Sequence, residues 1–306
     1  MLKYTFKQLR YVEAAGRLGS ISSAAAELAI SQSSITAAID AVEGELGYDL
    51  FIRTPARGIR PTPQGTQALN RIRVFIQQSQ HFEAEMQSMS GDLSGAIRIA
   101  CYGTAAPAVL PPILRGMTKV YPDMSFSVLE GSIARVIECL NKGEADLAFC
   151  YRSALESTHD FVPLFDAPPF AIVPRGDPLA DLASVSLSAL SQRGLITLDL
   201  PGAREYFGAM FDASGLSPKV THSTRSSEIL RALVGIGFGV SILNIRPMDY
   251  HPEESDYVIV PIKDAIQPPT FGIITISSVA QPRLVSAFIK SCNDLKKRGI
   301  FKNLTV

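Results

Sequence analysis

A cluster of polar side chains near the N-terminus has the composition of a surface that contacts DNA bases. Ser31 is followed by Gln32, Ser33, Ser34 and Thr36. A glutamine side chain can bond the edge of adenine at two points, and Ser or Thr hydroxyls can bond bases or phosphates. These five residues are therefore candidates for DNA contact. The alternative is a polar helix face that meets only solvent.

A basic segment follows these polar residues. Positions 50–82 contain no Asp or Glu, although the whole chain balances 29 Lys and Arg against 29 Asp and Glu. The arginines of this segment are Arg53, Arg57, Arg60, Arg71 and Arg73. Local positive charge of this kind is typical of a nucleic-acid-binding element. We expect Arg53, Arg57 and Arg60 to touch phosphates or the minor groove, the alternative being an ordinary surface charge.

A second set of candidate residues lies at the ends of predicted strands and the starts of helices further along the chain. Its members are Thr104, Ser132, Tyr151, Arg152, Gly202, Arg204, His222 and Asn244. Helices that begin after strands present unpaired N–H groups, which favour anions. A site in which hydrogen-bond donors outnumber carboxylates also prefers an anion. If the fold brings these residues together, they would suit a small molecule with an anionic group, and Arg204 is the first choice for that group.

Several members of this second set also have a structural explanation. A Ser, Thr or Asn at the end of a strand often serves only as a cap. His222 is better explained as a hydrogen-bonded structural residue than as a ligand contact. Arg204 can equally pair with Glu205 or another nearby acid.

The remaining reactive residues form no recognisable catalytic or metal site. The four cysteines contain no CxxC pair, and the four histidines lack the spacing of metal ligands. No nucleophile elbow, Walker loop or dinucleotide fingerprint is present. The glycines at 235, 237 and 239 follow a predicted helix, whereas a phosphate-binding loop opens one. The sequence therefore predicts neither an enzyme nor a bound cofactor or metal.

Short helices must position the first set of polar residues. An apolar stripe of Phe6, Leu9 and Val12 predicts a first helix that the glycines within 16–19 should end. Ser20 and Ser31 are the predicted N-caps of a second and a third helix, and Gly47 should end the third. Two short helices joined by a turn form a helix-turn-helix. Residues 51–54 and 57–62 then predict two short strands around a turn, which together make a wing.

A long helix is predicted over residues 64–89. Its apolar seam consists of Leu69, Ile72, Ile76, Ser79 and Met86, and Ala68, Phe75, Phe82 and Met89 recur every seven residues. No partner for this seam is evident within its own domain, so we expect it to pair two chains. The alternative is packing on the chain's own C-terminal domain. The Gly-Asp-Leu-Ser-Gly segment at 91–95 should form a hinge.

Residues 96–306 alternate predicted strands and helices. The strands are expected at 97–101, 125–129, 146–150, 195–198, 219–221, 239–243 and 270–276, and the helices at 108–120, 133–141, 204–211, 227–234 and 283–297. Such alternation predicts mostly parallel α/β sheets covered by helices. A stretch of about 210 residues is long enough for two such lobes.

Several segments resemble the LysR-type family of bacterial transcription regulators. They are Ser-Ser-Ala-Ala at 22–25, Ile-Ser-Gln-Ser-Ser-Ile-Thr at 30–36, Leu-Phe-Ile-Arg-Thr at 50–54, Arg-Pro-Thr-Pro-Gln-Gly at 60–65, Gly-Glu-Ala-Asp-Leu-Ala at 143–148 and Val-Gly-Ile-Gly-Phe-Gly-Val at 234–240. The sequence departs from the family pattern at Ser33, where proline is common. It also departs at Ala37 and Ala38, where larger polar residues are usual, and an alanine offers only a methyl contact, for example to thymine.

The resemblance implies a domain order and a regulatory mechanism. Residues 1–65 would form a winged helix-turn-helix and residues 66–91 a linker helix. Residues 92–306 would form a two-lobed α/β effector-binding domain resembling periplasmic binding proteins, with lobe I at 92–164 and 268–306 and lobe II at 165–267. The effector would lie between the lobes. Some family members sense peroxide through a cysteine pair in the second lobe, but residues 165–267 contain no cysteine, which excludes that mechanism in its usual form.

The implied partners are a pseudo-palindromic site on double-stranded DNA, a small organic effector and a second copy of the chain, paired through the linker helix. A tetramer is common in the family, and RNA polymerase stays open as a further partner. A secreted solute-binding protein would share the two-lobed fold. However, the first twenty residues carry polar and charged side chains where a secretory signal is apolar. No apolar run reaches the about 20 residues that span a bilayer, so we expect a cytoplasmic protein.

Overall fold

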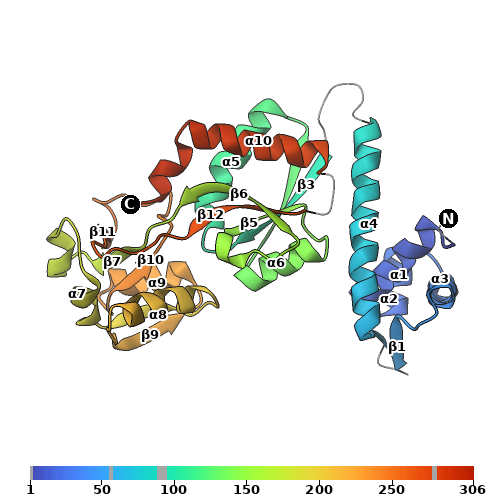
Figure 1. Ribbon diagram of the computed structural model, residues 1–306, viewed down its shortest axis with the longest axis horizontal. Helices are drawn as coiled ribbons and strands as arrows, with labels where there is room; N and C mark the ends of the chain where they lie inside the picture. The colour runs from blue at the N-terminus through green and yellow to red at the C-terminus, as the bar shows by residue number, and fades with distance from the viewer. Residues whose placement is uncertain (1–2, 55–57, 88–94, 278–280) are drawn as a thin grey trace. The chain divides into compact units, whose positions relative to one another are not determined.

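The computed structural model describes residues 3–54, 58–87, 95–277 and 281–306 (Figure 1). The chain divides into two compact units. One comprises residues 1–92 together with 141–144, and the other comprises residues 93–140 and 145–306. Each unit is described by itself below.

Three short helices, a two-stranded hairpin and a long helix make up the first unit. They are α1 (Phe6–Leu18), α2 (Ile21–Glu27), α3 (Gln32–Leu46), β1 (Phe51–Thr54), β2 (Gly58–Pro61) and α4 (Pro63–Gln87). The predicted N-caps are confirmed, because Ser20 Oγ accepts a hydrogen bond from Ser23 N and Ser31 Oγ accepts one from Ser34 N, each at 3.2 Å. Gly47 ends α3 in the left-handed conformation, with φ of 75°. The helix-turn-helix and the wing are therefore present as expected.

Gly16 differs from its expected role. It lies inside α1, which continues to Leu18 and ends at Gly19. A Cβ atom on Gly16 would lie 2.7 Å from Cδ1 of Leu69 in α4. The glycine therefore allows α1 and α4 to approach closely, and it does not break the helix.

The apolar seam of α4 has a partner within its own unit, which corrects the expectation from the sequence. Leu69 and Ile72 are buried, and Ile76 is partly buried, in a core that also contains Leu9 and Val12 of α1. This part of the seam therefore completes the core of the winged helix domain. Other apolar side chains of α4 stay exposed, and they are Phe75, Phe82 and Met86.

Lobe I of the second unit is built on a five-stranded sheet of order β4-β3-β5-β12-β6. Its strands are β3 (Gly95–Tyr102), β4 (Met124–Gly131), β5 (Leu147–Tyr151), β6 (His159–Asp166) and β12 (Thr270–Ile276). Its helices are α5 (Ala106–Val120), α6 (Ile133–Asn141) and α10 (Arg283–Lys297), followed by the short η4 (Ile300–Leu304). Figure 1 shows α5 and α10 on one side of the sheet and α6 on the other.

Lobe II contains a three-stranded sheet of order β10-β7-β11 and a β8-β9 pair. The strands are β7 (Phe170–Pro174), β8 (Leu195–Leu198), β9 (Val220–Thr224), β10 (Ser241–Leu243) and β11 (Tyr257–Pro261). The α-helices are α7 (Leu187–Ser191), α8 (Ala203–Ala213) and α9 (Ser227–Gly235).

The α/β class is confirmed, but the expectation of mostly parallel sheets is wrong. Strand β3 is parallel to β4 and β5, and β8 is parallel to β9. By contrast, β12 is antiparallel to β5 and β6, and β7 is antiparallel to β10 and β11. The strands β6, β7 and β11, which the sequence did not predict, supply three of these antiparallel pairs.

Candidate functional site

The polar residues proposed for DNA contact lie in the first two turns of α3 and its cap. Ser31, Gln32, Ser33 and Ser34 are exposed, and Thr36 is half-buried. The hydroxyls of Ser33 and Ser34 each lie 2.8 Å from Ser31 Oγ, and Thr36 Oγ1 donates to Gln32 O at 3.1 Å. Four hydroxyls are therefore engaged locally. The amide of Gln32 makes no side-chain hydrogen bond within the described part of the chain.

Arg53 is held by two acids of α3, so it differs from a free surface charge. Its Nη2 donates to Asp40 Oδ1 and, at 3.3 Å, to Glu43 Oε2. The hydrogen bond to Asp40 and the negative charges of both acids raise the pKa of Arg53. Glu43 Oε1 also accepts hydrogen bonds from the backbone N–H groups of Leu50 at 2.7 Å and Phe51 at 3.1 Å. Glu43 thus joins the wing to α3.

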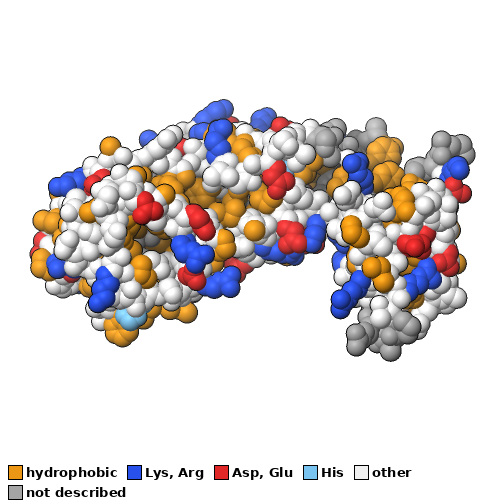
Figure 2. Space-filling model, turned by 60° about the horizontal axis from the view of Figure 1, so that its bottom comes forward, with side chains coloured by type: hydrophobic (Ala, Val, Ile, Leu, Met, Phe, Trp, Pro, Cys, Tyr) orange, Lys and Arg blue, Asp and Glu red, His pale blue; other side chains and the backbone are white. Residues whose placement is uncertain are grey.

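The other arginines of the basic segment differ in their surroundings. Arg60 is exposed on β2 opposite Ile52, and Arg71 is exposed on α4. Arg73 donates to Glu13 at 2.9 Å and is mostly buried by that contact. Arg57 lies outside the described residues. On the face that Figure 2 presents, basic and acidic side chains of the first unit lie side by side and no continuous basic area forms.

A cavity of about 660 Å³ separates parts of lobe I and lobe II. Lobe I lines it with the end of β3, the start of α5 and the end of β4, and lobe II lines it with the start of α9 and the segment after β10. The lining residues are Gly103, Thr104, Pro107, Ala108, Glu130, Gly131, Ser132, Leu200, Arg225, Ser226, Ser227, Glu228, Arg231, Ile245, Pro247, Met248 and Asp249. Two members of the predicted set, Thr104 and Ser132, are among them.

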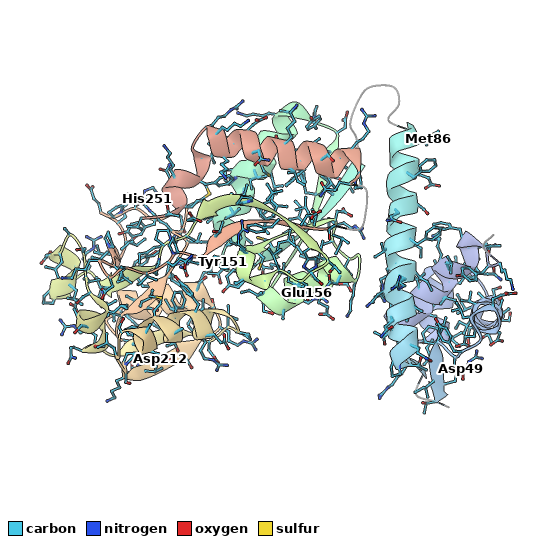
Figure 3. All side chains as sticks on the ribbon, in the orientation of Figure 1. Asp49, Met86, Tyr151, Glu156, Asp212 and His251 are labelled. Atoms are coloured by element: carbon cyan, nitrogen blue, oxygen red, sulfur yellow. The ribbon has the colours of Figure 1, made fainter. Side chains whose placement is uncertain are left out.

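A smaller cavity of about 50 Å³ adjoins the large one, and Thr104 and Ile245 line both. Its wall includes Tyr102, Tyr151, Gly202, Tyr206 and Asn244. Three of these belong to the predicted set. Figure 3 shows Tyr151 at the junction of the two lobes. The structure therefore gathers five of the eight predicted effector residues around two adjoining cavities.

Two hydrogen-bond donors of the small cavity, the Asn244 side chain and the Gly202 N–H, already have partners. The Tyr151 ring meets the Tyr102 ring edge-on at 5.8 Å, and burial raises the pKa of both phenols. Asn244 is buried and donates from Nδ2 to Ala167 O at 2.8 Å. The Gly202 N–H donates to the Glu205 carboxylate, so it is not the free anion-binding group expected at the start of α8. Both phenols stay neutral, and this cavity has no charged lining residue.

Three predicted effector residues line neither cavity. The Arg152 guanidinium lies over the Phe161 ring at 4.7 Å from its centroid. The exposed His222 ring lies against the Phe238 ring, tilted by 32°, with 5.4 Å between the centroids.

Arg204 is the third of these residues. It is ion-paired with Asp199 at 2.9 Å and lines a separate depression in lobe II of about 510 Å³. An acid partner was the stated alternative for Arg204, although Asp199 takes the place suggested for Glu205.

Five charged residues of the large cavity were missed by the sequence analysis. They are Glu130, Arg225, Glu228, Arg231 and Asp249. One signal was available for two of them: Arg225 and Glu228 flank Ser226, whose Oγ accepts from Ile229 N and caps α9 directly after β9. The predicted strand ended three residues too early at 221, so this strand-to-helix turn was not recognised.

Comparison with known proteins identifies the family. A family model described as LysR substrate binding domain matches residues 90–296. A second, described as bacterial regulatory helix-turn-helix protein of the lysR family, matches residues 6–66. The chain belongs to the LysR family. It is a DNA-binding transcriptional regulator with an effector-binding domain.

Curated relatives carry the same LysR-family architecture. The chain is similar to the HTH-type transcriptional regulator CysB of Burkholderia cenocepacia, with 30% identity over 80% of this chain and 79% of that protein. It is 27% identical to the regulator SsuR of the same organism over 81% of each chain.

A solved structure similar to this chain also belongs to a LysR-family regulator. The LysR-family regulator HinK of Pseudomonas aeruginosa is 29% identical, covers 96% of this chain and 99% of its own, and gives a TM-score of 0.63. All of these relatives are regulators, in agreement with the expectation that the chain is not an enzyme.

The cysteines of this LysR-family chain lie in the core. Cys101, Cys139, Cys150 and Cys292 are free and buried. Burial raises the pKa of Cys150 and of Cys292 to about 12. Within the described ranges no group of three His, Cys, Asp or Glu side chains is arranged to hold a metal ion. No helix in those same ranges has both the length and the apolar character needed to cross a membrane.

Proposed function

We propose that this LysR-family regulator binds its operator with the N-terminal half of α3 and the wing, and takes its effector in the two adjoining cavities between the lobes. The observation that carries the effector proposal is that Thr104 and Ile245 line both cavities. A single small molecule can therefore contact both spaces and both lobes. The proposed domains are residues 1–65, 66–91 and 92–306.

The operator proposal rests on the exposed start of α3. In a helix-turn-helix the second helix of the motif enters the major groove and its first residues meet base edges. The side-chain amide of Gln32 is exposed and makes no hydrogen bond within the described residues. In the wing, Arg60 is an exposed cation on the face of the hairpin opposite Arg53. Two such domains in a dimer would meet successive major grooves of a pseudo-palindrome, about 34 Å apart.

The proposed dimer contact is the exposed part of α4. Phe82 and Met86 are apolar and exposed, and they lie beyond the part of the helix that the winged domain buries. Phe75 is also exposed, although its ring contacts Phe6 of α1 edge-on at 6.1 Å. A tetramer and a contact with RNA polymerase are further proposals that rest on the family alone. The cytoplasm, where the DNA lies, is the proposed location.

The neighbours support these proposals only through the fold. A structure of full-length CbnR, solved with its target DNA, is 21% identical to this chain. The effector-binding domain of QuiR, solved with shikimate, is 20% identical over 67% of this chain. The first shows that the fold accommodates DNA in CbnR, and the second that it accommodates a small molecule in QuiR.

The operator proposal is tested with Arg60→Ala in the full-length chain. A phosphate contact contributes equally to specific and random DNA and releases counterions. We expect weaker binding to both DNAs, and a slope of log affinity against log salt that is smaller by about 1. Arg115→Ala, an exposed cation of α5, is the control. An unchanged slope in Arg60→Ala would remove the wing from the proposal.

The effector proposal is tested by a thermal-shift screen of small metabolites on the full-length chain, because a ligand that binds only the folded state raises its stability. Thr104→Val and Ser132→Ala should each lower the affinity for the compound identified in the screen by at least tenfold. Operator affinity without that compound should not change. If both variants bind it as tightly as the parent, the site lies elsewhere.

A further inference from the structure

The large cavity is lined by charged side chains of both signs. Two are guanidinium groups, Arg225 and Arg231 on or beside α9, and three are the carboxylates of Glu130, Glu228 and Asp249. Within the described residues none of these five side chains forms an ion pair or a hydrogen bond. Arg231 is half-buried and the other four are exposed.

Charges elsewhere in the same unit behave differently. Arg98 pairs with Asp146 at 2.7 Å, Arg193 with Asp177 at 3.2 Å and Arg204 with Asp199 at 2.9 Å. The three acids and two arginines that line the cavity do not form such ion pairs with one another. Their arrangement instead leaves both signs of charge facing the cavity.

The balance of these charges narrows the class of effector. A purely anionic compound would meet three carboxylates, and a purely cationic one would meet two guanidinium groups, so each would suffer repulsion. We propose that the effector is a small zwitterion, with an ammonium group and a carboxylate or similar anionic group on one short frame. This deepens the proposed effector function and rests on it. It replaces the plain anion expected from the sequence, because the cavity is lined by three carboxylates against two guanidinium groups.

The two ends of the zwitterion have different partners. Arg225 and Arg231 bind the anionic group, since guanidinium groups make charge-assisted and often bidentate bonds to carboxylates. Glu130 of lobe I and Asp249 of lobe II receive the ammonium group. The effector therefore bridges the lobes by opposite charges.

The remainder of the molecule enters the small cavity. That space is only about 50 Å³ and is lined by aromatic rings and neutral polar groups, with no charged lining residue. It accepts a short, uncharged side chain. The compound as a whole has the shape of a small α-amino acid, with its charged groups in the large cavity.

The test uses the full-length chain and matched sets of three compounds. Each set contains an L-amino acid with a short uncharged side chain, the carboxylic acid that lacks its amino group and the amine that lacks its carboxylate. L-alanine, propionate and ethylamine form one such set, and the corresponding sets for L-serine, L-valine and L-threonine complete the panel. We expect at least one amino acid to raise the melting temperature. Its two stripped analogues should give no shift at tenfold higher concentration.

Variants then assign the charges by calorimetry. Glu130→Gln and Arg231→Gln should each lower the affinity for the bound amino acid by at least tenfold. Glu253→Gln and Arg115→Gln, which are exposed and outside the cavity, should leave its affinity unchanged. The inference is overturned if no amino acid of the panel binds, if a stripped acid or amine binds as tightly as its parent, or if Glu130→Gln has no effect.

Failure of the wider proposal gives a different result. If Thr104→Val leaves the affinity of the bound compound unchanged, the cavity itself is not the effector site. If Thr104→Val weakens binding while Glu130→Gln and Arg231→Gln do not, the cavity is correct and only the zwitterionic character is wrong.

Discussion

The side chain of Gln32 occupies the position in α3 where polar groups are otherwise committed to local hydrogen bonds. The Ser33 and Ser34 hydroxyls contact the cap at Ser31, and the Thr36 hydroxyl bonds the backbone of the preceding turn. A hydroxyl that is already bonded can still touch a phosphate, but it has less freedom to distinguish bases. We therefore expect Gln32 to make the main base contact at the start of this helix.

Replacing Gln32 by Ala should weaken specific binding by about 1–3 kcal/mol, the range for loss of a bidentate base contact. Affinity for random DNA should stay nearly constant, because phosphate contacts are intact. Fluorescence anisotropy with operator and random duplexes measures both quantities. Gln192→Ala, an exposed change in lobe II, is the control. An equal loss on both duplexes would show that Gln32 contacts the backbone and not a base.

The buried thiols give a second prediction at this scale. Cys150 and Cys292 have pKa values of about 12 against an ordinary 9.0, so both stay protonated and shielded in the folded state. Ellman's reagent at pH 8 should label the native chain very slowly and the urea-unfolded chain rapidly, since the thiolate is the reactive form. Fast labelling of the native chain would contradict the burial of these side chains.

The same thiols predict the direction of alkaline destabilisation. Their pKa values are raised by folding, so below pH 9 they are neutral in both states and contribute full stability. Between about pH 9 and 12 the unfolded chain loses these protons first, and the free energy of unfolding falls. Buried tyrosines such as Tyr151 act in the same direction. A Cys150→Ala/Cys292→Ala variant should show a shallower fall in urea unfolding across this range.

At the scale of elements, the two halves of α4 differ in burial. Its first half contributes Leu69 and Ile72 to the core of the winged domain, and Phe82 and Met86 further along stay exposed. The Gly16 contact with Leu69 explains how α1 can lie close enough to share this core. Changes in the two halves of the helix should therefore have different consequences.

A Phe82→Asp/Met86→Asp variant should lose the dimer while the winged domain keeps its melting temperature, because only exposed positions change. An Ile72→Asp variant should lower the melting temperature sharply, since an unpaired charge would be buried. Light scattering and circular dichroism measure the two effects. A double variant that stays dimeric and keeps its operator affinity would rule out pairing through this part of α4.

The helices were more predictable than the strands, since among the described α-helices only α7 was missed, whereas β6, β7 and β11 were not predicted. The bounds of α6 and α10 agree with the expected 133–141 and 283–297, because apolar positions recur at helical spacing and the ends are marked. The strand β6 contains Pro163, which obscures the pattern of a strand, and its pairing with β12 is interrupted by a register shift at Phe271 and Gly272. Strand direction depends on which distant segment pairs, so the mixed sheet could not be inferred from local pattern.

At the scale of the whole molecule, the cavity joins segments that are far apart in sequence. Thr104 and Ser132 could be predicted because each follows a strand. Asp249 comes from a loop with no such signal, and Arg231 lies inside a helix where an arginine is ordinary. Only the arrangement of the lobes brings them together. An effector that prefers one arrangement tenfold supplies about 1.4 kcal/mol toward changing how the DNA-binding domains are presented.

Asn244 connects the lobes at the segment that crosses between them. Its amide donates to Ala167 O, and the Ala167 N–H donates to Pro269 O at 2.9 Å. Asn244→Ala would leave a buried carbonyl without its partner, which typically costs about 1–3 kcal/mol. We expect a lower urea midpoint, and effector affinity should change as well because Asn244 lines the small cavity. Asn303→Ala, exposed near the C-terminus, is the control; equal midpoints would contradict this role.

The carboxylate of Glu43 suggests how operator preference can diversify in proteins built like this one. It accepts hydrogen bonds from the Leu50 and Phe51 N–H groups and from the Arg53 side chain, and so links α3 to the wing. Glu43 is not among the residues proposed to contact DNA. The outer positions, including Gln32 and Ala37, are thereby free to vary without disturbing the joint. Transplanting only those positions from another regulator should exchange the preferred DNA sequence while the scaffold stays intact. The domain would then keep its fold while the residues that contact DNA are exchanged.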